Sequence, residues 1–158
     1  FSALGDVSGM QVFDLFAGTG ALGLEALSRG AASVTFVETS SRHLTFLRKN
    51  LDAVQKADPS LAEPVTRILR TDVRRLPERL QKEANSADIF FADPPYTKQK
   101  HIPDAVDLVT DGAFADWAKG GRLILEHPAE LEHRIAGTSC WDVQKCKRYG
   151  NTCISFLA

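Results

Sequence analysis

Short apolar segments alternate with amphipathic or strongly charged ones along the chain. The apolar segments are rich in β-branched or aromatic residues and end at turn residues, which predicts strands. They cover residues 10–16, 33–37, 65–69, 87–92 and 121–126. Most segments between them repeat apolar residues at steps of three and four, which predicts helices. The expected helices cover residues 21–29, 41–54, 73–84, 104–117 with a break near Gly112, and 130–135.

The end of the chain has a different pattern. Two segments, 141–148 and 152–157, lie on either side of Gly150-Asn151, which predicts a terminal antiparallel hairpin. Before it, strands alternate with helices, which indicates an α/β fold with a doubly wound, mostly parallel sheet. Ligands bind such sheets beyond the carboxyl ends of the strands, where the strand order reverses. The residues that follow the predicted strands are therefore candidates for chemistry.

The composition fits one globular domain over residues 1–158. Hydrophobic residues make up 44% of the chain and charged residues 25%, and no apolar run reaches the roughly 18 residues of a membrane span. The net charge is −1, so a nucleic-acid partner would need a local basic patch. The residues that follow Phe1 resemble the end of a helix, and we expect an N-terminal portion to be absent from this chain.

The cysteines and histidines give no sign of a metal site. Cys140, Cys146 and Cys153 are odd in number and lack the spacing of metal ligands. We expect reduced thiols packed as small apolar groups, which favours a cytoplasmic protein. His43, His127 and His133 are expected to be structural or exposed.

A glycine-rich turn follows the first predicted strand. Gly18-x-Gly20-x-x-Gly23 ends a strand and opens a helix, the context in which this pattern indicates nucleotide binding. Glu38, 20 residues beyond Gly18, can accept hydrogen bonds from both hydroxyls of a ribose. A bare strand-to-helix turn without a ligand is the less favoured alternative.

Two carboxylates bear on which nucleotide the turn binds. Asp14, at the end of the first strand, would repel a pyrophosphate but would suit the ammonium or sulfonium charge of S-adenosylmethionine (SAM). It can also serve only as a hydrogen-bond acceptor within the turn. Asp72 follows the third strand, where it can accept from an adenine amino group, cap the next helix, or do both.

The tetrapeptide Asp93-Pro94-Pro95-Tyr96 ends the fourth predicted strand. The prolines lack N–H groups and leave the local carbonyls free as acceptors. The Asp93 carboxylate and a nearby carbonyl can hold both N–H bonds of an exocyclic amine and stabilise the positive charge that develops on its nitrogen. Tyr96 can stack on the base. A proline-rich exit turn without a ligand is the alternative.

Basic residues follow this turn directly. Lys98 and Lys100 are placed to meet a phosphate beside the base. A second basic run, Arg67 to Arg79, fits a solvated helix face better.

The motifs together resemble those of a known family. Residues 14–31, Phe36-Val37-Glu38, Asp93-Pro94-Pro95-Tyr96 and Tyr149-Gly150-Asn151-Thr152 are similar to the RsmD family of bacterial SAM-dependent methyltransferases, which modify N2 of a guanine in 16S ribosomal RNA. The resemblance implies a Rossmann-like class I methyltransferase with a seven-stranded sheet, acting as a monomer on 16S RNA or the assembling small subunit. It also implies an N-terminal arm that this chain lacks.

The resemblance assigns roles to particular residues. It implies that SAM is held by Asp14, Phe16, Gly18, Gly20, Glu38 and Asp72. Asp93, Pro94 and Tyr96 would hold the guanine amine and carry the catalysis, while Pro95, Lys98 and Lys100 would bind the substrate. No metal is expected.

Three alternatives stay open at this stage. The chain could methylate an adenine amine in nucleic acid or a glutamine in protein, although the glutamine enzymes usually carry Asn where this chain has Asp93. It could be an NAD-binding oxidoreductase, in which Asp93 would have no role. It could also be an inactive scaffold with the same fold.

Overall fold

The computed structural model describes residues 5–96 and 104–158. Its centre is a seven-stranded sheet of order β3-β2-β1-β4-β5-β7-β6. The strands are β1 (Gln11–Asp14), β2 (Ser33–Glu38), β3 (Val65–Arg70), β4 (Ile89–Ala92), β5 (Arg122–Pro128), β6 (Val143–Tyr149) and β7 (Thr152–Leu157). The first five strands are parallel, whereas β7 runs antiparallel to both β5 and β6. The predicted doubly wound sheet with a terminal antiparallel hairpin is confirmed.

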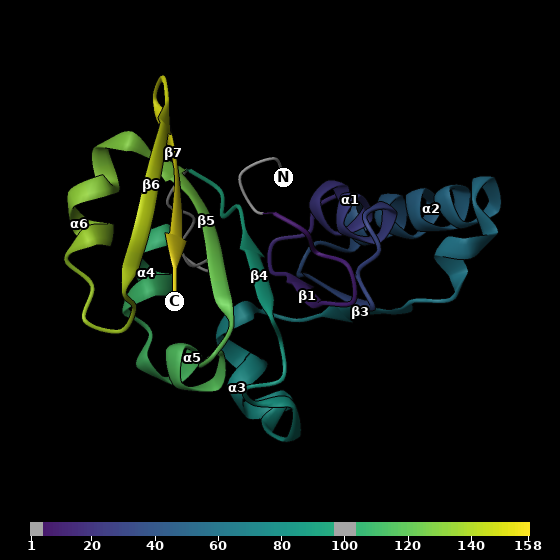
Figure 1. Ribbon diagram of the computed structural model, residues 1–158, viewed down its shortest axis with the longest axis horizontal. Coiled ribbons are helices and arrows are strands. Elements are labelled where there is room, and N and C mark those ends of the chain that lie inside the picture. Colours follow the sequence, from purple (N-terminus) through teal and green to yellow (C-terminus); the bar gives the residue numbers. More distant parts are fainter. Residues whose placement is uncertain (1–4, 97–103) are drawn as a thin grey trace.

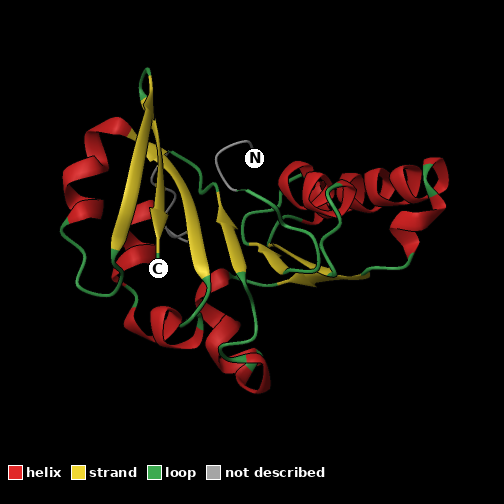
Figure 2. Cartoon of the chain, viewed as in Figure 1, coloured by secondary structure: helices red, strands yellow, loops and turns green. Residues whose placement is uncertain are grey.

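Helices cover both faces of this sheet (Figures 1 and 2). The α-helices are α1 (Ala21–Ser28), α2 (Ser41–Ala57), α3 (Leu76–Arg79), α4 (Ala105–Thr110), α5 (Gly112–Trp117) and α6 (Glu132–Ala136). Short 3-10 turns are η1 (Pro59–Ala62), η2 (Val73–Arg75), η3 (Gln81–Glu83) and η4 (Ala129–Leu131). Among the described residues, no helix has the length and apolar character that crossing a membrane requires.

The alternation of side chains along the strands divides the core in two. Val12 and Ile89 point to the face that packs against α1 and α2. Their neighbours Phe13 and Phe90 point to the other face, where they pack against α4, α5 and Trp117. Because the period of a strand is two, both faces of a parallel sheet must be covered by apolar helix faces. The helices on the two faces hold the sheet in place, so the carboxyl ends of the parallel strands lie along one edge.

The predicted helix at residues 73–84 is wrong. The chain there forms η2, the single-turn α3 and η3 instead. Pro77 explains the interruption, since a proline inside a helix removes a hydrogen bond and clashes with the preceding turn. It is tolerated here because it lies in the first turn of α3. The segment ends at Asn85, whose φ of 59° is left-handed.

Candidate functional site

A cavity of about 730 Å³ opens at the carboxyl ends of β1 to β5. This is the edge at which open α/β sheets bind ligands. Predicted site residues that line it are Phe16, Gly18, Glu38, Asp72, Asp93, Pro94, Pro95 and Tyr96. The predicted residues Lys98 and Lys100 lie outside the described part of the chain. The structure therefore brings the glycine turn and the Asp-Pro-Pro-Tyr turn to one cavity, although about 75 residues separate them in sequence.

The glycine turn is built around left-handed backbone. Gly18 and Gly20 have φ values of 53° and 92°, a region that side chains other than glycine rarely adopt. Gly20 is also the N-cap of α1, and a Cβ atom on it would lie 2.6 Å from Leu47 Cδ1. Gly20 does not line the cavity, so its part in the site is to shape the turn.

Asp14 lies below the turn instead of in the cavity wall. It is 2% exposed, and its Oδ2 accepts a hydrogen bond of 2.9 Å from the Gly23 N–H. Burial raises the pKa of Asp14 to about 7, and the nearby Asp93 and Glu38 add to the increase, while the Gly23 hydrogen bond opposes it. The observed contact is the within-turn acceptor role that the sequence left open.

Glu38 is the last residue of β2 and is hydrogen-bonded to the glycine turn. Its Oε2 accepts from the Gly18 N–H at 2.9 Å, and its Oε1 accepts from the Ser40 N–H at 2.8 Å. His43 Nδ1 lies 3.4 Å from the same Oε2. The carboxylate is thus fixed at the cavity wall, 20 residues after Gly18 as the motif predicts. His43, expected to be structural or exposed, lines the cavity while remaining half-exposed.

Asp72 takes the capping role considered for it and also pairs with Arg74. Its Oδ1 accepts from the Arg74 N–H at 2.9 Å and so caps η2, while Oδ2 lies 2.6 Å from Arg74 Nη2. Burial alone would raise the pKa of Asp72, but the hydrogen bonds from Arg74 outweigh it and lower the pKa. The carboxylate therefore stays ionised at the cavity wall.

The Asp-Pro-Pro-Tyr turn meets two residues that sequence reasoning missed. The Tyr96 hydroxyl donates to Glu126 Oε1 at 2.9 Å and lies 3.0 Å from Thr152 Oγ1. Glu126 is near the end of β5, and Thr152 begins β7. These contacts fix the hydroxyl and leave Tyr96 51% exposed at the cavity.

Glu126 also acts on Asp93. Although Asp93 is exposed toward the cavity, the surrounding protein partly desolvates its carboxyl group and raises its pKa to about 6, and repulsion from Glu126 adds to the increase. Four carboxylates, those of Glu38, Asp72, Asp93 and Glu126, line the cavity. Such a cavity attracts a cationic ligand and repels a pyrophosphate.

The expectation that the cysteines are packed, reduced thiols fits Cys153 best. Cys153 is buried, and its Sγ donates to Glu132 Oε2 at 3.7 Å. With Cys146 these groups lie within 4.8 Å of one another, a proximity that the spacing in sequence does not reveal. Burial raises the pKa of the Cys153 thiol to about 11, so the sulfur stays protonated.

The basic run Arg67 to Arg79 is largely paired. Arg67 pairs with Glu83, Arg75 lies 4.0 Å from Glu78, and Arg79 donates to the Arg70 carbonyl. Together with the Arg74–Asp72 pair, these contacts make the run a partly neutralised surface.

The strand order, the antiparallel β7 between β5 and β6, and the glycine turn after β1 define the class I methyltransferase fold. The chain belongs to the family described as "Conserved hypothetical protein 95", which matches residues 1–158. The resemblance to the RsmD family is thereby confirmed.

Named relatives agree with this family. "Ribosomal RNA small subunit methyltransferase D" of Haemophilus influenzae is 36% identical over 89% of this chain and 67% of its own length. The protein of the same name from Buchnera aphidicola subsp. Baizongia pistaciae is 30% identical over 85% of this chain and 62% of its own length. The chain thus spans about two thirds of these curated relatives. The solved structure of SMU.776 complexed with SAH (S-adenosylhomocysteine) shares the fold, with a TM-score of 0.74 at 15% identity over 97% of this chain and 46% of SMU.776.

Proposed function

We propose that the chain is the catalytic domain of a SAM-dependent methyltransferase that modifies the exocyclic N2 amine of a guanine in 16S ribosomal RNA. The observation that carries the proposal is the meeting of the Asp93 turn and Glu38 in one cavity lined by carboxylates. The substrate is 16S RNA or the assembling small subunit, which the named relatives support. We further propose that the domain acts in the cytoplasm as a monomer.

We infer the contacts with SAM from the residues of the cavity wall. Glu38, already held by the Gly18 and Ser40 N–H groups, accepts from the ribose hydroxyls. Asp72 accepts from the adenine amino group, and Phe16 contributes apolar surface to the same wall. Asp14, beneath the turn, has a pKa near neutrality, so a cationic ligand above it favours its ionised form. The bound cofactor supplies an activated methyl group.

The substrate side of the cavity holds the amine. Asp93 would accept one N–H of the guanine amine and the Pro94 carbonyl the other, which would orient the lone pair of the amine toward the cofactor side of the cavity. Most of the acceleration comes from this alignment, and the negative charge of Asp93 stabilises the positive charge that develops on nitrogen. Tyr96, anchored by Glu126 and Thr152, presents its ring for stacking on the base, with Pro95 beside it.

Cofactor binding gives the direct test of the class. We expect calorimetric titration with S-adenosylhomocysteine to show saturable binding and titration with NAD to show none. Glu38→Ala should weaken S-adenosylhomocysteine binding about 10- to 100-fold, because hydrogen bonds to a charged group contribute about 1.5–3 kcal/mol. Glu63→Ala, an exposed carboxylate away from the cavity, is the control. Binding of NAD in place of S-adenosylhomocysteine would contradict the proposal and support the alternative of an NAD-binding oxidoreductase.

The pKa of Asp93 predicts a pH profile. Because the ionised carboxylate is the form that accepts an N–H, kcat/KM for methyl transfer should rise with pH through about 6 and then level off. Glu126→Gln removes the neighbouring negative charge, which lowers the pKa of Asp93 and moves the inflection to lower pH. The glutamine still accepts from Tyr96. An inflection that stays in place or moves upward would show that another group controls the profile.

A further inference from the structure

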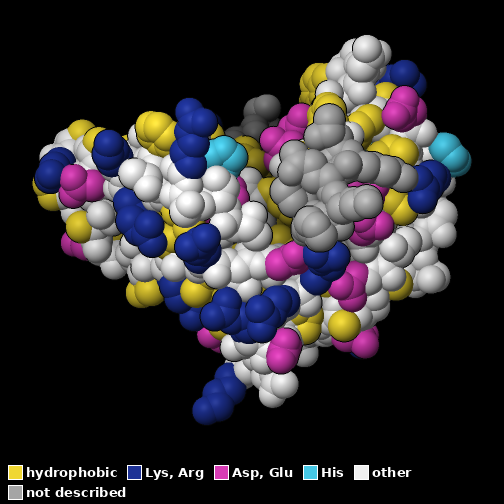
Figure 3. All heavy atoms as spheres, turned by 180° about the vertical axis from the view of Figure 1, so that it is seen from behind, with side chains coloured by type: hydrophobic (Ala, Val, Ile, Leu, Met, Phe, Trp, Pro, Cys, Tyr) yellow, Lys and Arg dark blue, Asp and Glu magenta, His cyan; other side chains and the backbone are white. Residues whose placement is uncertain are grey.

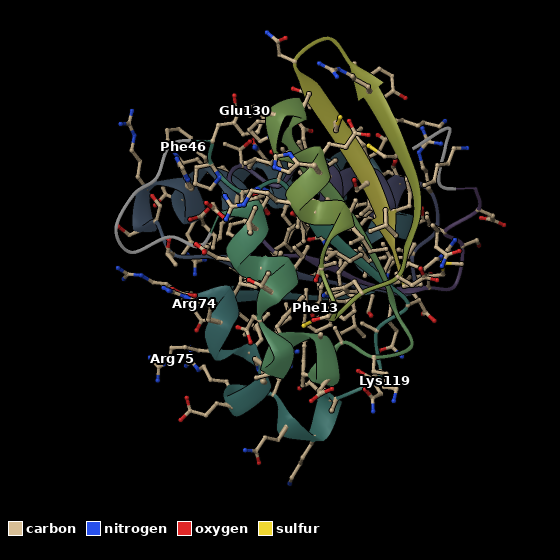
Figure 4. All side chains as sticks on the ribbon, turned by 90° about the vertical axis from the view of Figure 1, so that its left-hand side faces the viewer. Phe13, Phe46, Arg74, Arg75, Lys119 and Glu130 are labelled. Atoms are coloured by element: carbon tan, nitrogen blue, oxygen red, sulfur yellow. The ribbon has the colours of Figure 1, made fainter. Side chains whose placement is uncertain are left out.

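Helix α2 carries a stripe of exposed residues that the cavity does not use. The inner face of the helix is buried and carries Leu44, Leu47 and Leu51. Arg42, Phe46 and Lys49, which we call the α2 stripe, lie on the opposite face at steps of four and three. Phe46 is 44% exposed, one of the few large hydrophobic side chains with so much surface in water. Figure 4 shows it pointing away from the core.

The stripe carries positive charge without neutralising partners. Within the described residues, no hydrogen bond or ion pair joins the Arg42 or Lys49 side chain to an acid. The nearby acid Asp52 is paired with Lys56 at 2.7 Å. Figure 3 shows Lys and Arg side chains gathered over the part of the surface that α2 covers. An exposed aromatic ring between two cations is the combination that binds single-stranded nucleic acid through stacking and phosphate contacts.

The stripe lies next to the mouth of the cavity. His43 is in the first turn of α2 and lines the cavity, and Phe46 is one helical turn further along. Arg42 and Lys49 are separated by about 10 Å along the helix axis, a length that a short stretch of nucleic-acid backbone bridges. The cavity that Asp93 lines therefore extends to the first turn of this helix.

We propose that the α2 stripe docks the single-stranded RNA that flanks the target guanine, with a base stacked on Phe46 and phosphates paired with Arg42 and Lys49. The inference rests on the proposed function and names a second contact surface for its substrate. A second copy of the chain fits this surface less well. A symmetric contact would bring Arg42 and Lys49 against like charges, and a single aromatic ring is far smaller than the apolar centre of a stable dimer.

Binding of a labelled single-stranded RNA containing guanine, followed by fluorescence anisotropy at several salt concentrations, tests the stripe. We expect Phe46→Ala to weaken binding about tenfold. The double variant Arg42→Gln/Lys49→Gln should reduce the slope of log affinity against log salt by about 1.4. Lys119→Gln, which Figure 4 places on the opposite side, and the exposed Val65→Ala are matched controls that should bind like the parent.

A Phe46→Trp variant gives a readout that a merely structural role would not move. It should keep the RNA affinity of the parent, and RNA should quench its additional tryptophan emission as a base stacks on the ring. Unchanged RNA affinity in both stripe variants would overturn the proposal, as would emission that saturating RNA does not alter. Titration with S-adenosylhomocysteine distinguishes failure of the docking proposal from failure of the proposed function. If the parent binds S-adenosylhomocysteine but no RNA, the docking surface is wrong while the cofactor site stands, and if it binds neither, the proposed function itself fails.

Discussion

Asp93→Ala is expected to reduce the rate of methyl transfer to RNA by about 10²- to 10³-fold, because it removes a preorganised acceptor aimed at the charge that develops on the amine. The affinity for S-adenosylhomocysteine should stay within twofold of the parent, since Glu38 and Asp72 hold that part of the cavity. Single-turnover transfer of a labelled methyl group from SAM to RNA, together with calorimetry, measures both quantities.

Two comparisons make this result specific. Asp93→Asn keeps the shape of the side chain but loses its negative charge, so it should recover only part of the lost rate. Glu63→Ala, at an exposed site away from the cavity, should transfer the methyl group like the parent. Full activity of Asp93→Ala would remove Asp93 from the mechanism and favour an electrostatic role for Glu126 alone.

Much of the fold could be predicted because it depends on local patterns. The strands and the hairpin around Gly150 follow from runs of apolar residues and from turn residues, and both act over short distances. The segment after Asp72 could not be predicted in the same way. Its charged residues fit a helix, but Pro77 interrupts the hydrogen bonds and the short pieces are held by packing of Leu76 into the core.

The candidate site could be predicted only where motifs mark it. Gly18, Glu38 and Asp93 stand at recognisable positions after strands, and all three line the cavity. The sequence does not assign Glu126 or Thr152 to the site, although Thr152 lies in the Tyr149-Gly150-Asn151-Thr152 motif, because both residues reach Tyr96 only through the antiparallel pairing of β5 with β7. The approach of Thr152 to Glu126 depends on the register of β5 and β7, which local patterns do not determine.

Gly23, the third glycine of the motif, serves packing of α1 on the sheet. The third glycine of this motif permits close packing of the helix on a strand, and Gly23 is a buried residue of α1 that packs against β2. A Cβ atom on it would lie 2.2 Å from Cε1 of Phe36, which is fully buried. Phe36 has no free space into which it can move, because protein cores are close-packed.

Gly23→Ala is therefore expected to destabilise the domain by about 3 kcal/mol, the upper part of the range for an overpacked core. For a domain of this length that corresponds to a decrease of roughly 6–12 °C in Tm. Gly112→Ala is the matched control, because no atom lies within 4 Å of its added Cβ. Thermal unfolding of both variants measures the difference. If Gly23→Ala unfolds like Gly112→Ala but loses affinity for S-adenosylhomocysteine, the glycine serves ligand approach, and packing against Phe36 is not the reason for it.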